Sequence, residues 1–98
     1  MDLQELTQRM HSFVRSKGWY EPDSVKPQTP KNLAVSLVLE ANEVLELFQW
    51  SDELEDQDEL ASELADVMLY LIQLASVSQI DLETAMLSKL DENYDRTW

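Results

Sequence analysis

The chain has 98 residues, with 20 acidic and 7 basic side chains, a formal net charge of −13 and no cysteine. This length suits one domain over residues 1–98, and because so short a chain buries a small share of its surface, we expect copies to associate. The charge repels nucleic-acid backbones and anionic membranes, and the lack of cysteine excludes disulfides and is compatible with a cytoplasmic location.

The first predicted helix opens at Asp2 and ends near Gly18. Asp2 and Glu5 have the spacing of an N-terminal capping pair, and a glycine commonly follows a helix C-terminus. Charged residues occur in every turn, so we expect no secretory signal here. The chain's only glycine and its three prolines lie between residues 18 and 30, which predicts a linker there and helices on either side.

The second predicted helix has Thr29 as its N-cap and Pro30 at its first position, and it runs to about Trp50. Its core-facing stripe includes a carboxylate and consists of Leu33, Leu37, Glu40, Val44 and Leu47. At about 100° per residue, Glu43 falls within about 60° of Glu40, whereas Glu46 points about 120° away. A carboxylate on an apolar face loses hydration, which a cation or hydrogen-bond donors must replace.

The third predicted helix begins within the acidic segment "SDELEDQDE", where Asp56 and Glu59 form a capping pair, and it continues to about Ser78. Glu63 and Asp66 share one sector of this helix with apolar residues, namely Leu60, Val67, Tyr70 and Leu74. We expect no apolar stretch of the chain to be long enough to span a bilayer. A fourth helix is predicted after its cap, Asp81, with Ile80 as the preceding staple residue.

Two neighbouring helices therefore each carry an acid pair on the apolar face. A short turn joins these helices, so in an all-α fold they should pack antiparallel and bring the pairs together. Four like charges need a cation, and oxygen ligands without cysteine favour Mg²⁺, with Mn²⁺ as the alternative, over zinc or copper. The only histidine, His11, lies outside any Glu-x-x-His pattern, which argues against a di-iron bundle, and it receives no role.

These features also have structural interpretations. In a chain with 20 acidic residues a single acid pair is more often a solvated helix face, but the placement of both pairs on apolar stripes reverses that preference. Trp19, Trp50 and Tyr70, taken alone, are more often core or interface residues than base-stacking platforms. Lys89 and Asn93 alone fit an ordinary amphipathic helix surface.

The segments "EANEVLELFQW" and "ELASELADVMLYLIQLA" resemble the MazG-type all-α nucleotide pyrophosphohydrolases. "PKNLAVSLVLEANEVLELFQW" and the closing "VSQIDLETAMLSKLDENYDR" are similar to the dCTP pyrophosphatase branch, so the resemblance covers about residues 10 to 96. It implies a catalytic Mg²⁺ site made of Glu40, Glu43, Glu63 and Asp66. It also implies that Trp19 and Trp50 flank the base, that Asn32 and Tyr70 line the site, and that the phosphates or sugar are reached by Lys89, Asn93 and Arg96.

Two positions depart from the pattern of that family. Leu39 stands where the wider family often has a further Glu, and Met10 stands where the dCTP branch tends to carry a His. The first departure leaves the four-acid set intact, whereas the second bears on base preference.

Together these features predict a Mg²⁺-dependent enzyme that cleaves a dNTP, dCTP or a related one, to dNMP and pyrophosphate. The resemblance further implies an all-α four-helix bundle completed by oligomerisation, as a homodimer or homotetramer. The cytoplasm is the default location for a chain without cysteine. The alternative is a non-catalytic acidic helical bundle that binds a basic protein partner, as antitoxins and adaptors do. The two hypotheses differ in where the acids lie, because a partner-binding surface places its acids on solvent-facing sides of the helices.

Overall fold

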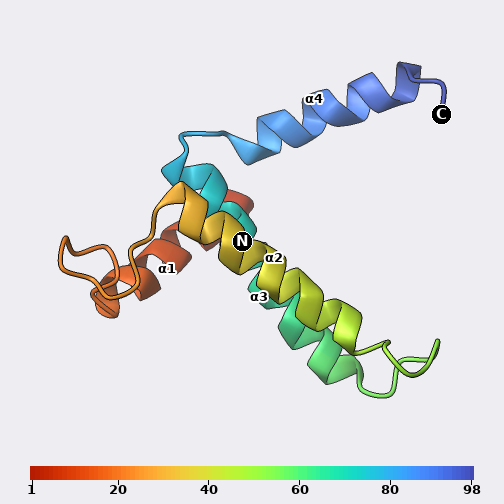
Figure 1. Ribbon diagram of the computed structural model, residues 1–98. Coiled ribbons are helices and arrows are strands. Elements are labelled where there is room, and N and C mark those ends of the chain that lie inside the picture. Colours follow the sequence, from red (N-terminus) through yellow and green to blue (C-terminus); the bar gives the residue numbers. More distant parts are fainter.

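The computed structural model describes residues 1–98 as four α-helices without strands, which confirms the all-α class. The helices are α1 (Leu3–Ser16), α2 (Pro30–Glu46), α3 (Gln57–Val77) and α4 (Leu82–Asp95). Figure 1 shows α2 and α3 side by side and running in opposite directions, as predicted, with α1 packed across the C-terminal part of α3. The linker, residues 17–29, connects α1 to α2.

Side-chain caps begin the helices at the predicted positions. Asp2 Oδ1 accepts a hydrogen bond from the Glu5 backbone N–H at 2.9 Å, and Thr29, Asp56 and Asp81 cap the other three helices in the same way. These bonds satisfy N–H groups that have no partner within the helix. Gly18 follows α1 with φ of 72°, a left-handed conformation that glycine adopts without steric cost.

The end of α2 differs from the sequence prediction. The helix stops at Glu46, about four residues before Trp50. The next three backbone N–H groups donate to carbonyls three residues earlier, and these donors are Leu47, Phe48 and Gln49. Such bonds are of the 3₁₀ type, so the chain tightens into turns at this point instead of continuing the α-helix.

The buried core of the single chain is small. Met10 and Val14 of α1 pack against Ile72 of α3, and these three residues form the core cluster. Along α2 the predicted stripe faces α3, with Leu33 fully buried, while on the opposite side Val38 is 66% exposed. The periodicity of the sequence therefore identified the inner faces correctly, but many apolar side chains remain on the surface.

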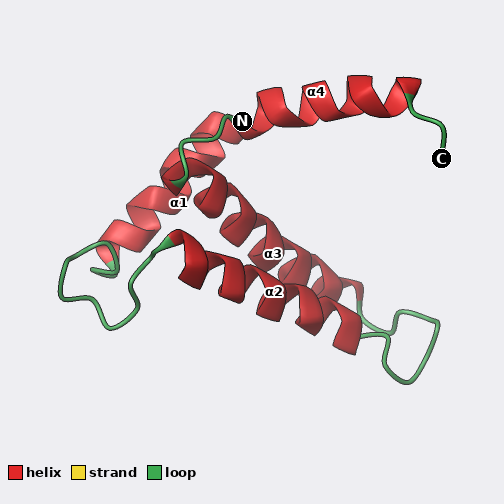
Figure 2. Ribbon diagram, turned by 45° about the horizontal axis from the view of Figure 1, so that its top comes forward, coloured by secondary structure: helices red, strands yellow, loops and turns green.

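The first residue of α4, Leu82, packs against the core cluster, but the other apolar residues of this helix are exposed. Figures 1 and 2 show it extending away from the α2–α3 pair, and none of its residues is buried. Met86, Leu87 and Leu90 are each more than half exposed. One chain therefore does not close a four-helix bundle, and completion of the bundle by further copies stays a prediction.

By length and composition, α3 is suited to cross a membrane, which differs from the sequence prediction that no such stretch exists. It has 21 residues and contains an 18-residue window with a mean hydropathy of 1.4. A single helix of this kind is weak support for a membrane span, because the central helix of a soluble protein passes the same test. In this fold α3 is the central helix and contacts α1, α2 and α4.

Candidate active site

The antiparallel α2–α3 pair brings acidic side chains from two helices together. One carboxylate oxygen from each of Glu40, Glu43 and Glu63 lies within 4.8 Å of the others. Asp66, about one turn along α3 from Glu63, lies outside this group of three but close enough for its charge to act on Glu40 and Glu63. The four predicted acids thus gather in one region, and their roles as ligands stay a prediction.

The pKa values of Glu40 and Glu63 are raised within this cluster. A hydrogen bond with the Glu43 carboxyl, then burial, then the negative charges of its neighbours raise the pKa of Glu63 to about 7. Burial, followed by the charges of Glu43 and Asp66, also raises the pKa of Glu40. The cluster therefore favours bound protons or another positive charge.

A divalent cation fits this cluster. One carboxylate oxygen of Glu40 and one of Glu63 are shielded from solvent and have no hydrogen-bond partner. No lysine or arginine pairs with the cluster, since the only ion pair in the structure joins Lys89 to Glu92. Unpartnered oxygens from several carboxylates are the donor set that Mg²⁺ or Mn²⁺ takes, and a cation there would offset the repulsion.

We expect the metal-free protein to lose stability as the pH rises from about 4.5 to about 7. Over this range folded Glu63 keeps a proton that an ordinary glutamate, with a pKa of 4.5, has lost in the unfolded chain, so rising pH favours unfolding. Thermal unfolding in EDTA, followed by circular dichroism at several pH values, measures the trend.

The control for this pH experiment is Glu63→Gln, which should unfold with a shallower pH dependence. His11 has a lowered pKa in the folded protein, so falling pH below 6.5 decreases stability through His11 while it increases stability through Glu63. Both proteins contain His11, so comparing them at each pH cancels its contribution. Saturating Mg²⁺ should raise the melting temperature at pH 7. Parallel pH curves for the two proteins, with no effect of Mg²⁺, would contradict a shared carboxylate site.

A pocket of about 430 Å³ opens beside the first turns of α2. Three residues that the resemblance assigned to substrate binding line it, namely Trp19, Asn32 and Tyr70. Tyr70 follows Asp66 by one turn on α3, and Ser36 of the pocket precedes Glu40 by one turn on α2, so the pocket adjoins the acid cluster along the helix pair. Its volume is in the range of small-ligand sites.

Local contacts hold the side chains of this pocket. Trp19 packs edge-on against Phe13 with 5.7 Å between ring centroids, and Lys26 Nζ lies 5.0 Å from the Trp19 ring. Asn32 Nδ2 donates a hydrogen bond to the Pro27 carbonyl at 3.0 Å. The linker thus forms one wall of the pocket, and α2 and α3 form the rest.

Two lysines in the pocket wall were missed by the sequence analysis. Lys26 and Lys31 line the same pocket as Trp19, and Lys26 lies over its ring. The signal was present in the charge distribution, because residues 1–31 hold five of the seven basic side chains but only four of the twenty acidic ones. The pocket therefore lies in the least acidic part of the chain, where an anionic ligand meets the least repulsion.

Other predicted site residues lie elsewhere in the single chain. Trp50 is 89% exposed and follows the C-terminal end of α2, whereas Trp19 lies at the N-terminal end of this helix, which is about 25 Å long. The two rings therefore do not flank one base within one chain.

The three basic and polar residues predicted to reach the phosphates are also separate from the acids. Lys89 and Asn93 belong to α4, and Arg96 follows it, where its guanidinium lies over the Trp98 ring at 4.1 Å. Lys89 pairs with Glu92 at 3.4 Å, and Asn93 Oδ1 is shielded without a partner. Because α4 extends away from the α2–α3 pair (Figure 2), these residues do not meet the acid cluster of their own chain.

Comparisons with known proteins relate the chain to nucleotide pyrophosphohydrolases. Residues 28–97 match the family described as the MazG nucleotide pyrophosphohydrolase domain. The dCTP pyrophosphatase 1 proteins of Homo sapiens and Rattus norvegicus are 36% and 35% identical to the chain, over 90% of its length and 55% of theirs. The chain thus spans about half the length of these relatives. The crystal structure of a pyrophosphatase from Archaeoglobus fulgidus superimposes with a TM-score of 0.79 at 35% identity, covering 93% of this chain and 87% of that one.

Proposed function

The chain belongs to the MazG nucleotide pyrophosphohydrolase family, and from that premise we propose that it hydrolyses dCTP or a related dNTP to dNMP and pyrophosphate, with Mg²⁺. The proposal depends above all on the cluster of Glu40, Glu43 and Glu63, whose oxygens lie within 4.8 Å of one another beside a pocket of nucleotide-binding size. The similarity to dCTP pyrophosphatases supports the choice of base.

The proposed reaction divides the site into two parts. Glu40, Glu43, Glu63 and Asp66 would hold Mg²⁺, which, when bound, supplies charge neutralisation for the triphosphate and lowers the pKa of the attacking water. The water oxygen would bond to the α-phosphorus and give up a proton to one carboxylate of the cluster. The bond from that phosphorus to the oxygen bridging the α- and β-phosphates breaks, and pyrophosphate leaves with the bridging oxygen. Trp19, Asn32 and Tyr70 would bind and orient the base end of the substrate.

We further propose that the active form is a homodimer or homotetramer in which a second copy completes each site. The exposed apolar residues of α4 support this, because a helix with such a face is stabilised by covering it. So does the placement of Trp50, of Lys89 and Asn93 in α4, and of Arg96 just after α4. These residues lie away from the acids of their own chain. In this arrangement they serve the acid cluster and pocket of the neighbouring copy.

A single cytoplasmic domain fits these features. Helix α1 precedes the matched residues 28–97 but shares the core cluster with α3 through Met10, Val14 and Ile72, so we treat residues 1–98 as one MazG-like domain. The lack of cysteine is compatible with the reducing cytoplasm, where we place the protein.

A panel of the common NTPs and dNTPs tests the proposed reaction. With Mg²⁺ we expect dCTP or a related dNTP to give equal amounts of monophosphate and pyrophosphate, separated by anion-exchange chromatography, and we expect EDTA to abolish turnover. Mn²⁺ should restore part of the activity. Release of orthophosphate and a nucleoside diphosphate would place the cleaved bond elsewhere and contradict the proposal.

The alternative function, binding of a basic protein partner, has less support. Glu40, Glu63 and Asp66 are half-buried on the facing sides of α2 and α3, and of the four acids only Glu43 is exposed. A docking surface for a basic partner would present its acids to solvent instead. Calorimetric titration with Mg²⁺ distinguishes the hypotheses, because only the metal site predicts saturable binding that Glu40→Gln weakens.

A further inference from the structure

Gln73 is the only polar side chain that is buried in the structure, with 3% of its surface exposed. It belongs to α3, and its Nε2 donates two hydrogen bonds, to the Tyr20 hydroxyl at 3.2 Å and to Gln28 Oε1 at 2.8 Å. Both acceptors are in the linker. One amide therefore ties the beginning and the end of the linker to α3.

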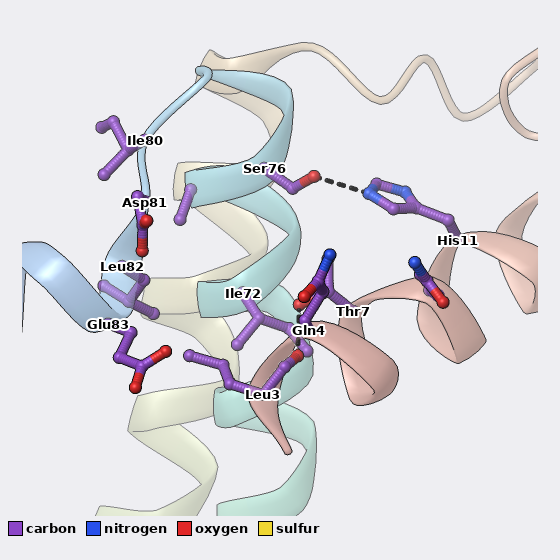
Figure 3. A pocket seen from close by; sticks show the side chains of 12 residues that line it. Leu3, Gln4, Thr7, His11, Ile72, Ser76, Ile80, Asp81, Leu82 and Glu83 are labelled. Carbon is purple, nitrogen blue, oxygen red and sulfur yellow. Dashed lines mark hydrogen bonds between the residues drawn. The ribbon is translucent and has the colours of Figure 1, made fainter. Parts of the chain in front are cut away.

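The Tyr20 hydroxyl also connects to α1. His11 Nδ1 lies 2.6 Å from this hydroxyl, and His11 Nε2 lies 2.7 Å from the Ser76 hydroxyl of α3. Figure 3 shows the contact between His11 and Ser76 beside a second cavity, of about 440 Å³, which contains none of the predicted site residues. Since the Tyr20 oxygen accepts from Gln73, its O–H can donate to Nδ1 while Nε2–H donates to Ser76, which satisfies all of these groups.

The constraint from Gln73 continues toward the pocket. Gln28, which accepts from Gln73, donates through its own Nε2 to the Lys26 carbonyl at 2.7 Å. The Lys26 ammonium in turn lies 5.0 Å from the centroid of the Trp19 ring. Gln28, Lys26 and Trp19 all line the proposed nucleotide pocket, whereas Gln73 itself does not.

We propose that Gln73 is a positioning residue for nucleotide binding, which holds the linker in the conformation that forms one wall of the pocket. The inference rests on the proposed function, because it takes this pocket to be the nucleotide site. Without the Gln73 hydrogen bonds, the linker is less ordered in the free protein. It must then be ordered when the nucleotide binds, and the entropy cost of that ordering weakens nucleotide affinity. The acid cluster lies elsewhere on the α2–α3 pair, so the chemical step should change little.

Gln73→Met tests this role, because methionine keeps the length of the side chain and removes both hydrogen-bond donors. We expect KM for the dNTP to rise about tenfold, the effect of two ordinary hydrogen bonds, while kcat stays within about twofold. Gln57→Met is the matched control, since it makes the same change at an exposed position of the same helix and should leave KM unaltered.

A second measurement needs no substrate. In a Trp50→Phe, Trp98→Phe background, Trp19 is the only tryptophan, and its quenching by acrylamide reports how firmly the linker packs. We expect Gln73→Met to increase the quenching constant about twofold without changing the helical circular dichroism signal. If that variant does not fold, Gln28→Met removes one of the same bonds at a half-buried position and should show the same direction of change.

The two readouts separate this inference from the proposed function. A wild-type protein that hydrolyses no nucleotide would overturn the proposed function, while Trp19 quenching would still test whether Gln73 fixes the linker. Unchanged quenching in folded Gln73→Met or Gln28→Met would overturn the positioning role. An unchanged KM in folded Gln73→Met would also contradict the positioning role. So would a tenfold fall in kcat, as large as the expected rise in KM.

Discussion

Glu40→Gln and Asp66→Asn are each expected to lower kcat by at least about a hundredfold. Each substitution keeps the size of the side chain but removes the charge of a proposed metal ligand, and small errors in positioning have effects of about this size. Glu40 is the stronger case, because one of its carboxylate oxygens is shielded and has no protein partner. Pyrophosphate release at saturating Mg²⁺ measures the loss, and calorimetry measures the accompanying fall in Mg²⁺ affinity.

Glu46→Gln is the matched control for the acid variants. Glu46 is on the same helix but is exposed, and it accepts a hydrogen bond from Asn42 Nδ2 at 3.0 Å on the outer face. Its replacement should change kcat only slightly. The Glu40→Gln protein should also melt at a higher temperature than the wild type in EDTA, because one of several repelling charges is gone. Equal losses of activity at Glu40 and Glu46 would mean that the inner face of α2 is not the site.

The sequence predicted those parts of the fold that depend on local interactions. Each helix begins at the residue after its predicted N-cap, because a cap is a contact within one turn. The four caps are Asp2, Thr29, Asp56 and Asp81. The inner faces of α2 and α3, and with them the meeting of Glu40 and Glu63, followed from helical periodicity and a short connection. The end of α2 was misplaced because the turn at residues 47–50 keeps an apolar sequence without a glycine or proline to mark it.

The features that the sequence did not predict depend on contacts between distant segments. Lys26 and Gln28 are in the linker, where no periodicity indicates which side chains face the pocket. His11 meets Ser76, 65 positions later, and Gln73 meets Tyr20, 53 positions earlier. The position of α4 was not predicted either, because Leu82 is its only apolar residue packed against the core cluster, while Met86, Leu87 and Leu90 stay exposed.

A mixture of two impaired variants, assayed at a nucleotide concentration too low to saturate the weaker binder, should recover activity if neighbouring copies share each site. Glu40→Gln damages the acid cluster, whereas the double variant Trp50→Ala, Arg96→Ala alters only residues that we assign to the neighbouring site. Because Trp50 is 89% exposed, its truncation should not destabilise the fold by the about 3 to 5 kcal/mol typical of a core tryptophan. The truncation of Trp50 should weaken nucleotide binding about five- to hundredfold through lost stacking, with Mg²⁺ affinity nearly unchanged.

In a mixed dimer of these variants, one site combines the intact acids of one copy with the intact Trp50 and Arg96 of the other, and the second site carries every substitution. Random assembly from equal amounts, by unfolding and refolding together, makes about half of the dimers mixed, so about a quarter of all sites should work. Native mass spectrometry must show the mixed dimers, and pyrophosphate release is then compared with that of each variant refolded alone. Mixed dimers with only the average activity of the two parents would show that Trp50 and Arg96 act with the acids of their own chain, which would require α4 and the residues after α2 to move toward Glu40 when the nucleotide binds.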